Sequence, residues 1–204
     1  KAGYRHIDTA RAYDNESDVG RAINAADVTR ENLFITTKLW NKDQGYDTAL
    51  EACEKSLARL DCGYIDLYLI HWPLKDLRND SWKAFIELQK WGLCRSIGVS
   101  NFTIDNLKEL EEKYDVLPAI NQVEFHPYHY QKELLEYCNS KNIIIEAYSP
   151  LVHAKRMDEP RLMAISDELG KTPAQVLIRW AIQRGMVVLP KSVNLDRIVE
   201  NFSV

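Results

Sequence analysis

The sequence has no long hydrophobic run and no excess of charge of one sign. No apolar stretch approaches the ~20 residues that span a bilayer. The 30 acidic and 26 basic residues are interspersed and leave a formal net charge of -4. We therefore expect neither a membrane nor nucleic acid as a partner.

Cysteine is scarce as well, with four residues in a chain of 204 and no CxxC pair. Isolated thiols of this kind favour a reduced, cytoplasmic protein and indicate no metal ligand set. The chain begins at Lys1 without an initiator Met or a signal peptide, and we expect it to be a fragment cut at both ends. A hydrophobic content of 46% with 27% charged residues predicts one globular domain, residues 1–204.

Seven short runs rich in β-branched and aromatic residues alternate with segments of helical periodicity. The expected strands are residues 4–7, 33–37, 65–70, 96–99, 119–123, 143–147 and 186–189. Several are apolar at nearly every position, which is typical of parallel strands buried on both faces. Asp47, Ser81 and the pair Thr172-Pro173 are expected to begin three of the helices.

This alternation predicts an α/β fold with a parallel sheet, either open and doubly wound or closed into a barrel. A doubly wound dinucleotide fold would carry a GxGxxG turn after a strand, and the sequence has none. We therefore expect a (β/α)8 TIM barrel. Because such barrels usually need ~250 residues, we expect its first βα unit and C-terminal tail to be missing from this chain.

Polar residues stand at the end of every expected strand. They are Asp8, Lys38, His71, Ser100, Asn101, Gln122, Glu124, Tyr148, Ser149, Lys191 and Ser192. Any one of them could simply reach solvent. Asp8, Lys38 and His71 directly follow apolar runs, however, and buried charges need partners. Catalysis in βα barrels collects at the carboxyl ends of the strands, so this edge is the candidate site.

Six motifs in a fixed order carry a resemblance to a known family. The first is residues 3–10 (GYRHIDTA), with Tyr13 following. The others are residues 69–73 (LIHWP), 98–102 (GVSNF), 121–124 (NQVE), 147–151 (AYSPL) and 190–193 (PKSV), the last followed by Arg197, Glu200 and Asn201. Across its whole length the chain resembles the aldo-keto reductase superfamily of NADPH-dependent aldehyde and ketone reductases.

The resemblance implies a catalytic set of Asp8, Tyr13, Lys38 and His71. Tyr13 would donate the proton, and Lys38 would favour the phenolate that forms. Asp8 would hold Lys38 charged, and His71 would donate a hydrogen bond to the substrate carbonyl. Sequence spacing alone does not separate Tyr13 from His71 as the acid, and Asp8 with Lys38 could form only a structural ion pair.

The resemblance also implies a cofactor site. Ser100, Asn101 and Gln122 would bind the nicotinamide carboxamide, Tyr148 would stack on the ring, and Ser149 and Leu151 would begin a loop over the pyrophosphate. The remaining expected contacts are Lys191, Ser192, Val193, Arg197, Glu200 and Asn201. Two cations near a 2′-phosphate favour NADPH over NADH, although Lys191 and Arg197 could also be a solvated patch.

Trp40 and Trp72 are expected to line an apolar pocket for a small aldehyde or ketone, and Trp72 could equally pack beneath a loop. The expected oligomeric state of the full-length protein is a monomer. One rival interpretation is a truncated cofactor-binding or structural protein with little turnover. A regulatory role like that of potassium-channel β-subunits is a weaker third.

Overall fold

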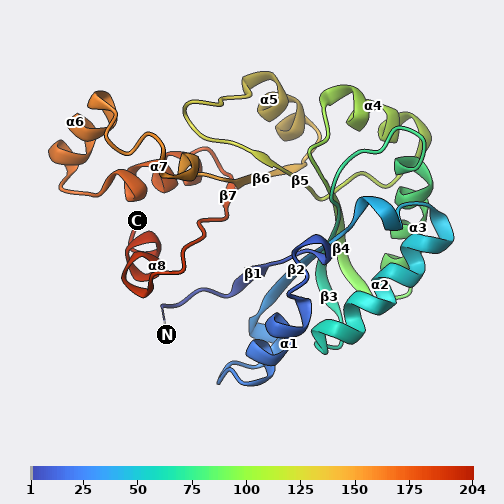
Figure 1. Cartoon of the computed structure of the whole chain (residues 1–204). Coiled ribbons are helices and arrows are strands. Elements are labelled where there is room, and N and C mark those ends of the chain that lie inside the picture. The colour runs from blue at the N-terminus through green and yellow to red at the C-terminus, as the bar shows by residue number, and fades with distance from the viewer. Residues whose placement is uncertain (1) are drawn as a thin grey trace. The chain divides into compact units, whose positions relative to one another are not determined.

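The computed structural model describes residues 2–204 and divides into two compact units. The N-terminal unit is Arg5–Asn121, and the C-terminal unit combines residues 2–4 with Gln122–Val204. Seven strands follow one another in sequence order along one sheet, with helices between them (Figure 1). The α/β class expected from the alternating pattern is confirmed.

The N-terminal unit has four parallel strands. They are β1 (His6–Asp8), β2 (Phe34–Leu39), β3 (Ile65–Ile70) and β4 (Cys94–Ser100). Four helices connect or follow them, namely α1 (Glu16–Asn24), α2 (Tyr46–Leu60), α3 (Arg78–Lys90) and α4 (Ile104–Lys113). Three single 3-10 turns complete the unit: η1 (Arg11–Tyr13), η2 (Arg30–Asn32) and η3 (Asn41–Asp43).

The core of this unit forms where its helices pack against the sheet. Every residue of β3 is buried, as the apolar run predicted. Gly20 of α1 sits against α2 so closely that a Cβ there would lie 2.5 Å from the carbonyl oxygen of Leu60. Only a glycine permits these two backbones to approach so closely.

Glu16 connects three elements of the N-terminal unit. Its carboxylate is 2% exposed and accepts hydrogen bonds from the Thr37 hydroxyl at 2.6 Å and from Nε of Arg59 at 2.7 Å. Thr37 lies in β2, and Arg59 lies in α2. A buried carboxylate needs such partners, so Glu16 fixes the start of α1 against the sheet.

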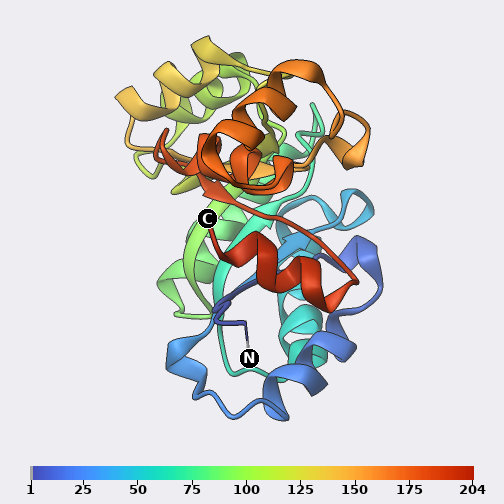
Figure 2. The same ribbon diagram turned by 90° about the vertical axis from the view of Figure 1, so that its left-hand side faces the viewer.

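The C-terminal unit contains the remaining elements. Its strands are most of β5 (Ile120–Glu124), β6 (Ile144–Tyr148) and β7 (Val187–Val188), and β6 pairs in parallel with β7. Its helices are α5 (Lys132–Ser140), η4 (Val152–Ala154), α6 (Pro160–Leu169), α7 (Pro173–Ile182) and α8 (Leu195–Phe202). Figure 2 shows α6 and α7 from the side, together with α8. The rings of Tyr4 and Phe202 lie 4.9 Å apart and tie residues 2–4 to α8.

The strands were predicted in the correct number and order, but most of them end later than expected. Strand β1 ends with Asp8, and strand β2 contains Lys38. Both residues therefore belong to strands instead of following them. The expected strand ended at Thr37, the last residue before the charged Lys38. Lys38 stays in the strand because its ammonium group finds an acidic partner inside the protein.

The expected helix starts were correct in one case and wrong in two. Thr172 forms a capping box with Gln175 at the start of α7, with Pro173 in the first turn. Helix α2 begins at Tyr46, before Asp47. Helix α3 begins at Arg78, and the Ser81 hydroxyl donates to the carbonyl of Leu77 inside the helix. Serine can make this internal bond as readily as it caps a helix.

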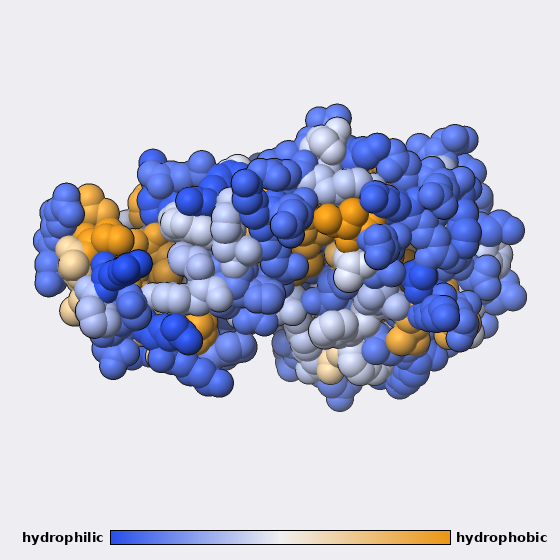
Figure 3. Space-filling model, turned by 90° about the horizontal axis from the view of Figure 1, so that it is seen from above, coloured by the Kyte–Doolittle hydropathy of each residue, from blue (hydrophilic) through white to orange (hydrophobic). Residues whose placement is uncertain are grey.

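Figure 3 shows a mostly hydrophilic face with separate hydrophobic patches. Among residues 2–204, no helix combines the length and the apolar character needed to cross a bilayer. All four cysteines are free and buried. Cys53 and Cys94 are neighbours, with their sulfur atoms 3.6 Å apart.

Candidate active site

The centre of the candidate site is a buried ion pair in the N-terminal unit. Lys38 of β2 is 0% exposed, and its Nζ donates to Oδ1 of Asp8 at 2.5 Å and to the carbonyl oxygen of Thr9 at 2.9 Å. Asp8 ends β1, the strand beside β2. Neighbouring parallel strands therefore deliver the ammonium and the carboxylate to one edge.

Tyr13 stands over this pair. It ends the turn η1, its amide donates to the carbonyl of Ala10 at 3.0 Å, and its side chain is 52% exposed. Nζ of Lys38 lies 5.0 Å from the centre of the Tyr13 ring. A phenol that is open on one side and faces a cation on the other can release a proton outward while its developing charge is stabilised.

His71 faces Tyr13 from the end of β3. Their ring centres are 5.9 Å apart and the ring planes are nearly perpendicular, at 85°. Burial and, to a smaller extent, the nearby Lys38 cation lower the pKa of His71 from 6.5 to about 4, and the Asp8 carboxylate opposes the change. The imidazole is therefore neutral at pH 7 and can donate a hydrogen bond without carrying a charge.

The two expected pocket tryptophans differ in their environment. The Trp40 ring lies 5.3 Å from the His71 ring at an angle of 67°. Trp72 follows His71 and is 43% exposed. The Trp40 ring therefore adjoins the imidazole, whereas Trp72 exposes part of its apolar surface to solvent.

Ser100 and Asn101 follow the same edge at the end of β4. Asn101 has the left-handed backbone that asparagine tolerates, with a φ of 62°. Its Nδ2 donates to the carbonyl of His71 at 3.0 Å and to the Ser100 hydroxyl at 3.1 Å. The structure thus brings these two expected cofactor contacts next to His71.

Two residues of this site were not expected from the sequence. Thr9 contributes a backbone carbonyl to Lys38, and its hydroxyl donates to Oδ1 of Asn15 at 2.6 Å. Gln44 is 4% exposed, and its Nε2 donates to the carbonyl of Trp72 at 2.6 Å. A threonine beside an aspartate and a glutamine in a polar loop carry no distinctive sequence signal. Only the position of Gln44 shortly after Trp40 hints at a contact with the site.

In the C-terminal unit, the expected nicotinamide contacts lie on β5 and β6. Gln122 is buried, and its Nε2 donates to Oε2 of Glu146 at 2.6 Å, which orients the amide. Tyr148 ends β6 and is partly exposed, as are Ser149 and Leu151 after it. Ser149 has a φ of 49°. The chain therefore turns sharply where the loop to α6 begins.

The expected phosphate contacts surround the N-terminus of α8. Lys191 and Arg197 are exposed, and neither forms an ion pair with another residue of the described chain. The Ser192 hydroxyl accepts from the amide of Asn194 at 3.1 Å, and Asn194 caps α8 through the amide of Arg197. Two uncompensated cations at a helix N-terminus suit a phosphate.

Three further expected cofactor residues have different environments in the C-terminal unit. Val193 is 85% exposed, whereas Asn201 is buried. Oε1 of Glu200 accepts from the Thr172 hydroxyl at 2.5 Å, which joins α8 to the cap of α7. Glu200 thus has a structural partner already.

Comparisons with known proteins identify the family. The chain matches the Aldo/keto reductase family over residues 1–204. It is 50% identical over 204 residues to a glyoxal reductase of Bacillus subtilis, a match that covers 100% of this chain and 74% of that protein. It is 48% identical over 208 residues to the methylglyoxal reductase DkgA of Salmonella typhimurium, covering 100% of this chain and 75% of the relative.

Similar solved structures are aldo-keto reductases as well. The crystal structure of an aldo/keto reductase from Brucella melitensis matches with a TM-score of 0.96 and 48% identity, covering 99% of this chain and 79% of that one. A Bombyx mori aldo-keto reductase in complex with NADP matches with a TM-score of 0.92 and 40% identity, covering 99% and 73%. The chain belongs to the aldo/keto reductase family. It is an NADP-dependent oxidoreductase that acts on carbonyl groups.

Proposed function

We propose that this protein reduces small aldehydes or ketones to alcohols with Tyr13 as the proton donor. The observation that carries the proposal is the position of Lys38, whose Nζ contacts the Asp8 carboxylate at 2.5 Å and lies 5.0 Å from the centre of the Tyr13 ring. A buried cation held beside a phenol stabilises the phenolate that remains after proton transfer.

The cofactor is NADPH, which supplies a hydride to the carbonyl carbon when it is bound. The chain's residues fit it, because Lys191 and Arg197 have no carboxylate partner among residues 2–204 and flank the start of α8. Ser100, Asn101 and Gln122 offer a hydroxyl and two amides for the carboxamide. Tyr148 provides a partly exposed aromatic face, and the segment from Ser149 and Leu151 onward would cover the pyrophosphate.

The chain's own residues then complete the reduction. His71 donates a hydrogen bond to the carbonyl oxygen and orients it. Tyr13 transfers its phenolic proton to that oxygen as negative charge develops, leaving a phenolate beside Lys38. Water returns a proton to Tyr13 after the alcohol leaves. Because the pKa of His71 is lowered to about 4, the imidazole carries no spare proton at pH 7, and this favours Tyr13 over His71 as the acid.

Small reactive aldehydes are the proposed substrates. Relatives with 50% and 48% identity are named glyoxal reductase and methylglyoxal reductase. Trp40 beside His71, together with the exposed Trp72, offers aromatic walls to such molecules.

We further propose that the seven strands belong to an eight-stranded barrel that forms one domain, because the relatives extend beyond the matched part. We also propose that the full-length protein is a monomer of the cytoplasm.

Replacing Tyr13 by Phe tests the proposal. The variant should bind NADPH as the wild type does and lose activity about 100-fold or more, the range typical of general acid catalysis. NADPH absorbance would be followed with methylglyoxal, and NADPH binding would be measured by fluorescence quenching. Tyr4→Phe is the matched control and should keep full activity. An active Tyr13→Phe variant would refute the assigned donor, and a wild type that binds NADPH without turnover would favour a structural or regulatory protein.

A further inference from the structure

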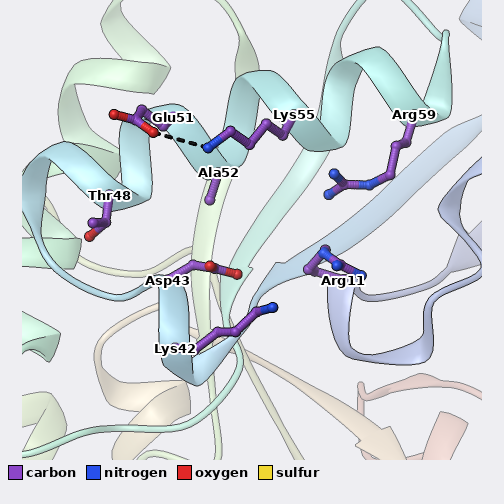
Figure 4. A pocket seen from close by; sticks show the side chains of 8 residues that line it. All are labelled: Arg11, Lys42, Asp43, Thr48, Glu51, Ala52, Lys55 and Arg59. Carbon is purple, nitrogen blue, oxygen red and sulfur yellow. Dashed lines mark hydrogen bonds and ion pairs between the residues drawn. The ribbon is translucent and has the colours of Figure 1, made fainter.

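A polar cavity of about 270 Å³ lies within the N-terminal unit, between η1, η3 and α2. Its lining residues are Arg11, Lys42, Asp43, Thr48, Glu51, Ala52, Lys55 and Arg59. Figure 4 shows the side chains of Arg11, Lys42 and Arg59 directed toward one space, with Lys55 turned onto Glu51. None of these residues belongs to the catalytic set or to the expected cofactor contacts.

The four cations of this cavity differ in how strongly other residues hold them. Lys42 forms no ion pair with any described residue. Arg11 pairs with Asp14, whose side chain is 87% exposed, and Lys55 pairs with Glu51, where both side chains are at least 65% exposed. Solvent screens the exposed Asp14 carboxylate and both members of the Lys55–Glu51 pair, so an anion entering the cavity can compete for both cations.

Arg59 is the fixed member of the group. Its Nε donates to the buried carboxylate of Glu16 at 2.7 Å, and its Nη2 donates to the Ser56 hydroxyl at 3.0 Å. These bonds hold the guanidinium plane in place, and Figure 4 shows the guanidinium group directed toward the cavity. A guanidinium with its orientation already set loses little entropy when it binds a phosphate.

The acidic residues of the cavity restrict what can fill it. Asp43 and Glu51 would repel a second anionic group, but they accept hydrogen bonds from hydroxyl groups. The Thr48 hydroxyl already donates to the carbonyl of Gln44 at 2.9 Å and still has acceptor capacity. The cavity therefore suits a molecule with a phosphate at one end and hydroxyl groups at the other.

We propose that this cavity binds a small phosphorylated polyol. Arg11, Lys42 and Arg59 bind its phosphate, and Asp43, Glu51 and Thr48 accept its hydroxyl groups. Arg11 shares the turn η1 with Tyr13, so the bound molecule would lie next to the loop of the catalytic phenol without occupying the catalytic site.

Calorimetric titration of the whole chain with glycerol 3-phosphate tests the proposal. Binding should persist when NADP+ is saturating, because the phosphate contacts proposed for the cofactor lie on other residues. Lys42→Gln should weaken binding about fivefold or more, since it removes a charge-assisted hydrogen bond to the phosphate that solvent only partly screens. Lys108→Gln replaces an exposed lysine of α4 outside the cavity and should leave binding unchanged.

The other outcomes would overturn the proposal. Equal affinity in the wild type and Lys42→Gln would remove the site from this cavity, as would binding abolished by NADP+. Inorganic phosphate that binds as tightly as glycerol 3-phosphate would refute the polyol part. A titration without NADP+ keeps the test independent of the proposed reductase function, because it does not require the cofactor to bind.

Discussion

Lys38 combines complete burial with a positive charge, and its contacts explain why the chain tolerates this. The carboxylate of Asp8 and the carbonyl of Thr9 replace the water that burial removes. Sequence reasoning could foresee that Lys38 needs a partner. It could not place Gln44, because a contact across 28 residues depends on how two loops fold toward each other.

Gln44→Leu should reduce turnover without abolishing folding. The change removes the bond from Gln44 to the Trp72 carbonyl, which keeps its bond from the Leu74 amide at 3.0 Å, so we expect a cost of about 0.5–1.5 kcal/mol in the free energy of unfolding. Because Trp72 adjoins His71, we expect kcat/KM for methylglyoxal to fall about tenfold while the dissociation constant of NADPH stays the same.

The matched control is Gln89→Leu, since Gln89 also donates to a backbone carbonyl, that of Arg95 at 3.2 Å, but in an exposed position. It should leave kcat/KM unchanged. If both variants lose activity equally, Gln44 is not a positioning residue. Gln44→Asn, which keeps the amide on a shorter side chain, should recover part of the activity.

The His71 imidazole should remain neutral across the physiological range. Its pKa is lowered from 6.5 to about 4 by burial and by the Lys38 cation. NMR of the imidazole should therefore show no titration between pH 5.5 and 8, whereas His71 in Lys38→Met should titrate at higher pH because the cation is gone. A wild-type titration near pH 6.5 would contradict the neutral hydrogen-bond donor.

The same lowered pKa links His71 to stability. Between pH 6.5 and about 4 the unfolded chain binds a proton at this position that the folded chain does not. The contribution of His71 to stability is therefore fully present above pH 6.5 and is lost as the pH falls toward 4. His71→Asn should flatten this part of the pH dependence of urea unfolding.

At the scale of elements, the turn η4 carries an unusual backbone. Val152, His153 and Ala154 have φ angles of 53°, 50° and 59°, in the left-handed region. A β-branched residue is strained there. The apolar, helical and turn patterns of the sequence predicted strands and helices in the right order, yet nothing in them marked this segment, because left-handed turns without glycine have no pattern.

Val152→Gly should stabilise the protein. Relief of the left-handed conformation is worth about 1–2 kcal/mol, and the entropy that glycine loses on folding offsets about 0.5–1 kcal/mol of it. The expected result is a rise of a few degrees in Tm by differential scanning calorimetry. Val187→Gly in strand β7 is the control and should lower Tm. A fall in Tm for Val152→Gly would argue against strain in the turn.

For the whole molecule, the order of strands and helices followed from the periodicity of the sequence, because alternating βα units leave few parallel arrangements. The exact ends of the strands did not follow from this periodicity. Their ends are set by partners that lie far apart in the chain, such as Asp8 and Lys38. The identity of the cofactor rests on charges of the C-terminal unit, and these can be tested directly.

Lys191→Ala should weaken NADPH far more than NADH. The ammonium group is exposed and has no ion pair among the described residues, so the expected loss for NADPH is about five- to tenfold, equivalent to a little over 1 kcal/mol. NADH should change by less than about twofold. Dissociation constants from fluorescence quenching would measure both, with Lys171→Ala as the control, and equal losses for the two cofactors would argue against a 2′-phosphate contact.

The segment that carries Tyr13 is anchored at both of its ends. Thr9, before it, bonds to Thr36 through its amide at 2.9 Å and to Asn15 through its hydroxyl, and Glu16, after it, is held by Thr37 and Arg59. The segment is thus held on both sides of Tyr13, whose side chain is half exposed to solvent. Under the proposed mechanism a carbonyl compound must align itself at Tyr13, and we expect the exposed aromatic surface of Trp72 to contribute to selectivity among aldehydes.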